Sequence, residues 1–389
     1  MSFLTSIASA FKGAGDGRVP LSRGYVSPWA LALESAGGPP SYEYSASIRA
    51  GFLANPIAQR AAKIVCEGVG GAPVSATDDA VMRLVSATSA GQSLIETLAG
   101  HLLLHGNGYI QILKDGSGTP IELFALRPDR IEVVAGDDGW PTAFDYRLSH
   151  QTVRIAAHDD AGWPEIIHVK ALHPTDDHYG AGSLRAAHEA ISVHNAALRW
   201  NRSLLENAAR PSGALVFDSP DGASLTQDQF DRLRDELATA FSGYANAGRP
   251  MVLDGGLRWQ SMALSPADMD FAELKSGAAR DIALAFGVPP MLLGLPGDNT
   301  YSNYREANRA LWRLTLLPLA DKILAALQEG LAPWYPGARL TVDLDRVTAL
   351  SEDRERLWKQ LSEADFLTAD EKRAMLGLEP LGKDAQVTS

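Results

Sequence analysis

The sequence contains only one cysteine, Cys66, in 389 residues. A single thiol excludes an internal disulfide framework and a zinc site built from cysteines, and it is typical of a reducing compartment. Charged residues are also few, at 21%, whereas 46% of the residues are hydrophobic. This composition can supply real cores and is not that of a disordered chain, and the length is sufficient for two or three domains.

Basic residues are in the minority. There are 35 lysines and arginines against 47 acidic residues, which gives a formal net charge of −12. No segment gathers enough lysine and arginine to predict a surface that grips a DNA duplex by its phosphates. Taken alone, the mild acidity indicates only solubility.

Long hydrophobic runs are missing as well. The longest, Ile282 to Pro296, is too short to span a bilayer and contains three prolines. The N-terminus lacks the leading positive charge and the cleavage site of a signal peptide. Its Phe3, Ile7 and Phe11 recur at helical spacing, which favours an arm or a tail over a membrane contact. We therefore expect no association with a membrane.

The common sequence signatures of catalysis are absent. Gly106-Asn107-Gly108 follows a predicted helix and precedes a predicted strand, the reverse of a phosphate-binding loop, and no Walker sequence occurs. No Gly-x-Ser-x-Gly elbow is present, and Cys66 lies in no recognised nucleophile context. We predict a non-enzymatic protein with no catalytic residue and no cofactor. An enzyme of unassigned chemistry on an α+β scaffold remains the alternative.

Two groups of histidines have the residue types of metal sites. One is the segment His173 to His178, which includes Asp176 and Asp177; the other is His101 and His105, one helical turn apart. A metal site also needs convergent ligands and supporting groups. The prolines and glycines around the first segment favour a solvated loop, and the leucines around the second favour the core or its rim. We predict no metal site.

Hydrophobic periodicity predicts an α+β fold. Residues 1–45 look irregular, and helices are expected over Ser47–Val65, interrupted by Pro56, and over Thr88–Leu104. The period then changes to two. Short strands are expected, separated by turn signals, at Tyr109–Leu113, Ile121–Leu126, Ile131–Val134, Phe144–Leu148, Thr152–Ile155 and Glu165–Val169.

A long helix is predicted from Ser183 to Ala209, where Pro211 stops it. After it comes a compact insert. The insert is expected to hold a strand at Ala214–Phe217, a helix that Thr226 and Gln229 cap, and a hairpin turning at Asp254-Gly255-Gly256. Two long helices on either side of this insert predict a small domain at the end of a two-helix stalk.

The stretch from Phe271 to Pro318 is the most informative. Ser265-Pro266 is expected to start a helix that ends at Gly287, and Asn303 with Glu306 is expected to start another as a capping box. Pro318 should kink that second helix, unless two helices with a break replace it. In such a unit the two helices position the rigid loop between them. This arrangement is not typical of a catalytic site.

Two further elements follow. Leu340–Leu344 is expected to be a single strand that returns to the sheet of the first domain. From Ser351 onward the pattern is helical and highly charged, with an apolar stripe at Leu357, Leu361 and Leu367.

Together these segments resemble the portal proteins of tailed double-stranded-DNA phages, including their prophage and gene transfer agent relatives. The similarity runs from about residue 45 to the C-terminus. The matching motifs are Gly106-Asn-Gly-Tyr109, His168 with Tyr179-Gly-Ala-Gly-Ser183, Asn207 to Gly213, Ile282-Ala-Leu-Ala-Phe-Gly-Val-Pro-Pro-Met-Leu-Leu-Gly294, Tyr301-Ser-Asn303 and Leu314-Thr-Leu-Leu-Pro318. Each motif alone is weak, but their order is specific.

The resemblance implies a division of the chain into the parts of a portal subunit. These are an N-terminal arm (1–45), a wing (46–181, completed by 334–350), stem helices (182–209 and 266–287), a clip (210–265), a tunnel loop (288–302), a kinked wing helix (303–333) and a helical crown (351–389).

The resemblance also implies the function. Portals form rings, normally of twelve copies, through which double-stranded DNA is packaged and ejected at one capsid vertex. The implied partners are the terminase large subunit, the major capsid protein and a head–tail adaptor. The implied location is the virion, after assembly in the cytoplasm of a bacterial host. A collar or adaptor ring protein is a further alternative.

Candidate channel residues follow from this assignment. Because a basic bore would hold DNA by its phosphates, an acidic or neutral lining would let the duplex slide. The stem candidates are Asp268, Asp270, Glu273 and Asp281. The tunnel-loop candidates are Gly297, Asp298, Asn299, Thr300 and Tyr301. The predicted hinge and kink positions are Pro289, Pro290 and Pro318.

Overall fold

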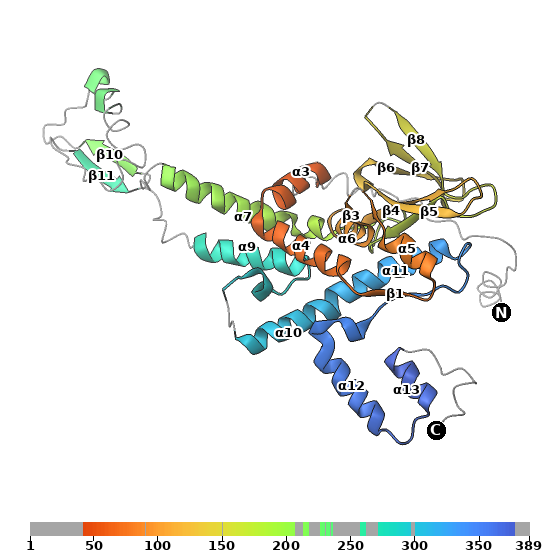
Figure 1. The fold of residues 1–389 in the computed structure, drawn as a ribbon. Helices are drawn as coiled ribbons and strands as arrows, with labels where there is room; N and C mark the ends of the chain where they lie inside the picture. Colours follow the sequence, from red (N-terminus) through yellow and green to blue (C-terminus); the bar gives the residue numbers. More distant parts are fainter. Residues whose placement is uncertain are drawn as a thin grey trace, which may run out of the picture.

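We describe the protein from a computed structural model. The structure describes residues 42–377 except 90, 150, 207–212, 218–225, 230, 234, 236–256, 262–270 and 297–299. The chain forms a body with strands at one end, and the helices α7 and α9 extend from it together (Figure 1). Among the described residues, no helix combines the length and apolar character needed to cross a bilayer.

Three helical segments open the described chain: α3 (Tyr44–Ile48), the π-helical η1 (Arg49–Leu53) and α4 (Pro56–Gly70). Asn55 caps α4, because its Oδ1 accepts the backbone N–H groups of Ile57 and Ala58, both at 3.0 Å. The interruption predicted at Pro56 is therefore confirmed as the start of a new helix. The strand β1 (Val74–Ala76) and the helix α5 (Asp79–Ser86) follow and were not predicted.

The single helix predicted over Thr88–Leu104 is wrong at its start. The strands β2 (Thr88–Ser89) and β3 (Gln92–Ser93) form a small hairpin, and only then does α6 (Leu94–Leu104) begin. Gly91 has a φ of +80° in the hairpin turn. A glycine takes this left-handed conformation at low cost, which favours the turn over continuation of a helix.

All six predicted strands are present. They form two antiparallel three-stranded sheets, with the strand orders β5-β4-β9 and β6-β7-β8. Their bounds are β4 (Asn107–Lys114), β5 (Pro120–Leu126), β6 (Ile131–Ala135), β7 (Pro141–Arg147), β8 (Thr152–Ala156) and β9 (Ile166–Lys170). A short 3-10 turn, η2 (Pro128–Arg130), joins the two sheets.

The main core lies between the sheet β5-β4-β9 and the helices α4, α6 and α11 (Leu317–Leu331). Leu98, Ile110, Ile323 and Leu327 are among its fully buried side chains. A smaller core forms around Tyr109, and its buried members are Tyr109, Leu126, Ile131, Phe144, Ala157 and Ile166. The strand β12 (Leu340–Val342) does return to the first domain, but it pairs with β1 rather than with either three-stranded sheet.

The remaining elements extend or flank this body. They are α7 (Ser183–Glu206), β10 (Gly213–Phe217), β11 (Leu257–Ser261), α9 (Phe271–Ala285), η4 (Pro290–Leu293), α10 (Tyr301–Leu311), η5 (Trp312–Leu316), η6 (Leu344–Arg346), η7 (Thr348–Leu350), α12 (Ser351–Glu363) and α13 (Ala369–Leu376).

Two predictions for the insert can be compared with these bounds. The strand predicted at Ala214–Phe217 is present as β10. β10 pairs antiparallel with β11. The capping box at Thr226 is confirmed, since Thr226 and Gln229 exchange side chain–backbone hydrogen bonds. The hairpin predicted at 254–256 and the end of the long helix at 207–209 lie outside the described residues.

Candidate functional site

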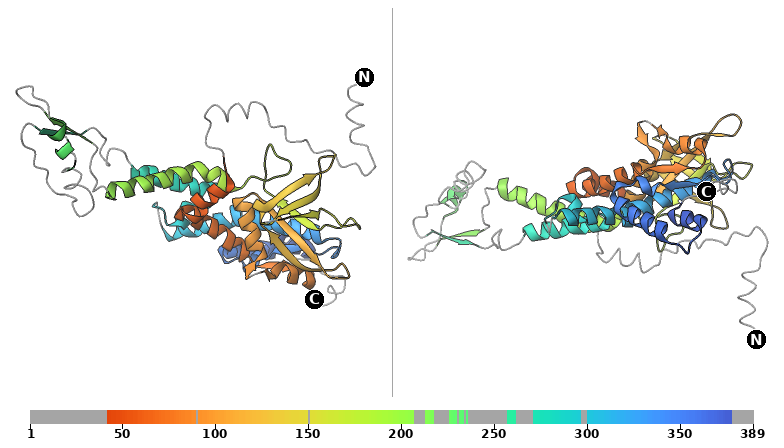
Figure 2. Two further views of the ribbon diagram at one scale, coloured as in Figure 1. Left: turned by 90° about the horizontal axis from the view of Figure 1, so that it is seen from above. Right: turned by 60° about the horizontal axis from the view of Figure 1, so that its bottom comes forward.

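Helices α7 and α9 lie side by side in every view and extend away from the body (Figures 1 and 2). Apolar residues, most of them alanines, line the buried faces of these two helices: Leu184, Ala187, Ile191 and Ala197 on α7, and Ala278, Ala279, Ile282 and Ala283 on α9. The alanines let the two backbones approach closely. His194 on α7 is also buried, and its Nδ1 lies 3.0 Å from Nδ2 of Asn55, the residue that caps α4.

The acidic residues predicted to line a channel can be placed only in part. Glu273 and Asp281 lie on α9 and are exposed, whereas positions 268 and 270 lie outside the described residues. The same helix carries Lys275 and Arg280, so its acidic and basic side chains balance. The described part of α9 is thus close to neutral, and Glu273 and Asp281 remain candidates.

The end of α9 follows the sequence prediction. Gly287 has a φ of +67°, and the N–H of Val288 bonds to the carbonyl of Ala283 at 2.9 Å. This left-handed ending terminates the helix. Thr315 Oγ1 donates to the carbonyl oxygen of Gly287 at 2.7 Å. The chain before the loop is therefore bonded to the helix that follows the loop.

The first half of the loop has a defined path. Pro289 and Pro290 lead into the 3-10 turn η4, which Gly294 ends with a φ of +72°. Arg280 on α9 then donates from Nη2 to the carbonyl oxygen of Pro296 at 2.9 Å. The loop is thus held to α9 up to residue 296. Gly297, Asp298 and Asn299 lie outside the described residues.

The second half of the loop begins at Thr300. This residue, not Asn303, is the N-cap of α10, and its side chain accepts the N–H of Asn303 at 3.2 Å. The capping box predicted from Asn303 and Glu306 is therefore wrong, because a hydroxyl three residues earlier takes the capping position. Tyr301 is the first residue of α10, and its side chain is 79% exposed.

The backbone is helical without a break from Tyr301 to Leu331. One π turn, η5, lies directly before Pro318, and in it the N–H of Leu317 bonds to the carbonyl of Trp312. Proline has no N–H to continue the α-helical ladder, so a change of register at this place accommodates it. A bend at Pro318 itself stays a prediction.

A cluster of ion pairs joins α10 to α12. Arg309 contacts Glu352 at 2.9 Å and Asp353 at 3.3 Å, and Arg305 also contacts Glu352. The Arg309 side chain is only 16% exposed, and it reaches Glu306 on its own helix at 2.9 Å. The sequence contains no pattern that pairs these two helices, so the cluster was not predicted.

The glycine motifs near 106 and 180 meet in space. A Cβ atom on Gly106 would lie 2.5 Å from the carbonyl oxygen of Gly180, and one on Gly180 would lie 2.1 Å from that of Gly106. Asn107 Oδ1 accepts the N–H of Gly180 at 2.8 Å and lies 3.2 Å from His168 Nε2. These residues form a backbone crossing at the base of α7. The crossing does not have the geometry of a phosphate-binding loop.

His101 and His105 are half-buried, at the rim of the core, and His173 to His178 lie in a loop, as predicted. Burial is the main cause that lowers the pKa of His101 to about 4, and burial also lowers that of His105. In the other segment, Asp176 Oδ1 accepts the N–H groups of His178 and Tyr179 and shapes a turn. Within the described part of the chain, no three metal-binding side chains converge.

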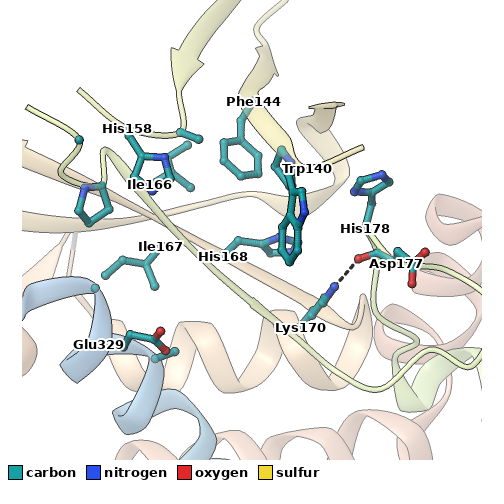
Figure 3. A pocket seen from close by; sticks show the side chains of 16 residues that line it. Trp140, Phe144, His158, Ile166, Ile167, His168, Lys170, Asp177, His178 and Glu329 are labelled. Atoms are coloured by element: carbon teal, nitrogen blue, oxygen red, sulfur yellow. Dashed lines mark hydrogen bonds between the residues drawn. The ribbon is translucent and has the colours of Figure 1, made fainter. Parts of the chain in front are cut away.

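A cavity of about 580 Å³ lies between β7, β9 and α11 (Figure 3). Trp140, Phe144 and His168 form its aromatic side, and Glu329 of α11 lies across from them. Lys170 donates to the carbonyl of Asp177 at its rim. The residues lining this cavity include no serine, threonine or cysteine, so it offers no hydroxyl or thiol nucleophile.

Burial in this cavity disfavours the cationic form of His168. Its ring stacks on that of Tyr109 with the centroids 4.3 Å apart. Burial, aided by the charge of Lys170, lowers its pKa to about 3. The aromatic side of the cavity is therefore neutral.

Known proteins are similar to this chain in sequence and in fold. The profile described as "Phage portal protein" matches residues 51–377. An uncharacterised protein of Rickettsia felis is 44% identical over 294 residues, covering 75% of both chains. A chain of the virion of the native gene transfer agent particle is 44% identical with a TM-score of 0.67, covering 90% of this chain and 99% of that chain.

A further structure shows the same fold in an assembly. It is the neck of the native gene transfer agent particle, computed with C12 symmetry; one of its chains is 45% identical, with a TM-score of 0.67 and the same coverage. The family profile spans nearly all described residues, and the similarity to these chains is far above that of fold alone. The chain therefore belongs to the phage portal protein family.

Proposed function

We propose that this chain is the subunit of a twelve-membered ring through which double-stranded DNA enters and leaves a tailed-phage-like particle, at the capsid vertex. The observation that carries the proposal is its similarity, over 90% of its length, to a chain in a gene transfer agent neck computed with C12 symmetry. The portal family is structural, so the prediction of a non-enzymatic protein is confirmed.

The physics of ring closure supports the proposal. One copy presents two long helices, α7 and α9, that project from the body and enclose nothing by themselves (Figure 2). A head-to-tail contact whose rotation closes converts such a surface into a channel. In this assembly α7 and α9 form the stem, and the described α9 contributes Glu273 and Asp281 as lining candidates.

The charge of α9 fits passage of DNA better than tight binding. DNA carries one charge per roughly 1.7 Å of axis, and each phosphate contact to lysine or arginine adds to salt-dependent affinity. An acidic or charge-balanced lining makes no net attractive contribution to the binding of DNA. Two carboxylates and two cations on α9 meet this requirement.

We assign the narrowest ring of the channel to the loop between α9 and α10. Its base is held by Gly287 bonded to Thr315 and by Arg280 bonded to Pro296. We assign residues 288–302 to the tunnel loop, with Thr300 and Tyr301 beside its tip. A firmly held base would keep a set of identical side chains at one radius in the ring.

The partners follow from the family and are part of the proposal. The insert at 210–265 would form the clip that receives the terminase large subunit. The wing would face the major capsid protein, and a head–tail adaptor would bind to the assembled ring. The segment from Ser351 onward would form the crown.

Native mass spectrometry of the purified full chain tests the proposal. A portal assembles into large closed rings, whereas a monomeric or dimeric enzyme does not. Negative-stain images should show a central hole. A particle preparation that lacks this chain should contain capsids without DNA, which a collar or adaptor protein added after packaging would not produce. Monomers as the only species at high protein concentration would refute the ring.

A further inference from the structure

The two-helix hairpin of α12 and α13 carries both an exposed aromatic side chain and a pocket with apolar and cationic walls. Phe366, in the turn between the helices, is 87% exposed, which is the largest exposed fraction of any described large hydrophobic side chain. Isolated exposed apolar residues are ordinary on protein surfaces. Here, however, the phenylalanine ring is almost wholly in water and a pocket lies on the same hairpin. This combination indicates a binding partner.

The pocket lies between the two helices and has a volume of about 300 Å³. Its lining combines apolar and cationic side chains: Trp358, Leu361, Ser362, Ala369, Lys372, Arg373 and Leu376. Phe366 is not part of this lining and does not fill the pocket of its own chain. One phenylalanine side chain fits within this volume.

The walls of the pocket are held in place by specific bonds. Trp358 Nε1 donates to Asp345 Oδ1 at 3.2 Å, and Arg354 donates to the carbonyl of Leu376 at 3.0 Å. Arg354 also makes a bidentate contact with Asp345 at 2.6 and 3.0 Å. These bonds join α12 to η6 and to the end of α13.

We propose that, in the assembled ring, Phe366 of each subunit inserts into the Trp358–Leu376 pocket of the adjacent subunit. This inference rests on the proposed ring. A heterologous contact joins two different surface patches on identical chains. In a closed ring, the Phe366 side chain of each subunit, here called the knob, therefore meets one pocket. Lys372 and Arg373 would add attraction for the ring face of the phenylalanine, since cations close to an aromatic ring are favoured.

The size of the contact defines its role. An aromatic side chain buries about 150–250 Å², whereas a stable protein interface buries roughly 1,200–2,000 Å². The knob and pocket therefore cannot hold two subunits together alone. They fix the relative position of neighbouring crown hairpins within a ring that other contacts close.

Disulfide trapping between two differently tagged chains tests this contact. One chain carries Phe366→Cys and the other carries Lys372→Cys, and both are produced together so that rings contain both. Burial raises the pKa of the native Cys66 thiol to about 12, so Cys66 stays protonated, and the wild-type chain serves as its control. The expected product under mild oxidation is a disulfide-linked pair that carries both tags, one from each chain.

The control pair replaces Phe366→Cys with Glu355→Cys, an exposed position of α12 that does not line the pocket. The cross-link should fall to background in this pair. A second comparison uses uncrosslinked rings: Phe366→Ser should lower the temperature at which rings dissociate, while Met375→Ser, at a 59% exposed position outside the pocket, should not.

The other results would overturn the inference. A product joining only two Phe366→Cys chains would show that the knobs meet each other. Rings seen by native mass spectrometry without the mixed disulfide would refute the crown contact and leave the proposed ring intact. If neither wild type nor variants formed rings, the proposed function would fail, and this inference with it.

Discussion

Thr315 donates its hydroxyl to the carbonyl oxygen of Gly287 at 2.7 Å, and this bond joins the end of α9 to the π turn before α11. The two residues lie on opposite sides of the loop, 28 positions apart in sequence. The contact leaves no room for a larger residue, because a Cβ atom on Gly287 would lie 2.7 Å from Thr315 Oγ1. It fixes where the loop begins relative to where it ends.

Gly287→Ala should destabilise the protein more than Gly294→Ala. Both glycines have a left-handed φ, which costs an alanine about 1–2 kcal/mol. Only Gly287 has a neighbour within 4 Å of the added Cβ, whereas Gly294 has none. Urea unfolding of the two variants measures the difference. Adding Thr315→Ala to Gly287→Ala should recover part of the loss; equal losses at both glycines would contradict the steric argument.

Arg309→Met should cost more stability than Arg305→Met. Arg309 is 16% exposed and contacts two carboxylates of α12, whereas Arg305 is 48% exposed and contacts one. Exposed ion pairs contribute about 0.2–1 kcal/mol, while hydrogen bonds to charged groups contribute about 1.5–3 kcal/mol. We expect a difference of about 1 kcal/mol in thermal or chemical unfolding. A double-mutant cycle with Glu352→Gln should show coupling to Arg309; no coupling would mean that the cluster does not join the helices.

The stability of the protein should fall as the pH is lowered from about 6.5 toward 3. Burial holds the pKa of His168 near 3 and that of His101 near 4, both below the ordinary value of about 6.5 in an unfolded chain. Between the folded-state and unfolded-state pKa of each histidine, the unfolded protein binds more protons than the folded protein. The stability that each histidine contributes is therefore fully present above its unfolded pKa and is lost as the pH falls toward its folded pKa. The slope for one such group is about 1.4 kcal/mol per pH unit.

Urea unfolding at pH 7, 6, 5 and 4 checks this prediction. His168→Gln removes one of the two groups and retains an amide that can reach Asn107, so its stability should depend less steeply on pH than that of the wild type. An unchanged slope would mean that His168 does not carry the effect.

Local patterns in the sequence were sufficient to place most elements. The alternation after residue 106 and the turn signals located all six strands, because side-chain period and turn chemistry are local properties. They could not show that β4 pairs with β9 rather than with β6, since the register Tyr109↔His168 depends on contacts between distant segments. The same limit explains why the partner of β12 was found only in the structure.

Where two local signals competed, the sequence alone could not choose. Thr300 and Asn303 are both good helix caps, and the structure uses the earlier one. Thr88 was assigned to a helix, although a turn at Gly91 divides that segment. Nothing in the sequence except the glycine itself indicated the contact between Gly287 and Thr315. The channel residues are the hardest to predict from the sequence, because which side chains face a bore depends on neighbouring copies.

Deletion of Gly297 to Asn299 should impair DNA retention while leaving ring assembly intact. The deletion shortens the tip of the loop but keeps Thr300, the cap of α10, and the bond from Arg280 to Pro296 that holds the base. A matched control is Thr368→Ala, which removes the cap of α13 at a cost of about 1 kcal/mol and leaves the loop unchanged. Native mass spectrometry measures assembly, and the DNA content of purified particles measures retention. Because the tip would be the narrowest ring around the duplex, only the deletion should lower the DNA content. Normal filling with the shortened loop would show that these residues do not contact DNA during packaging.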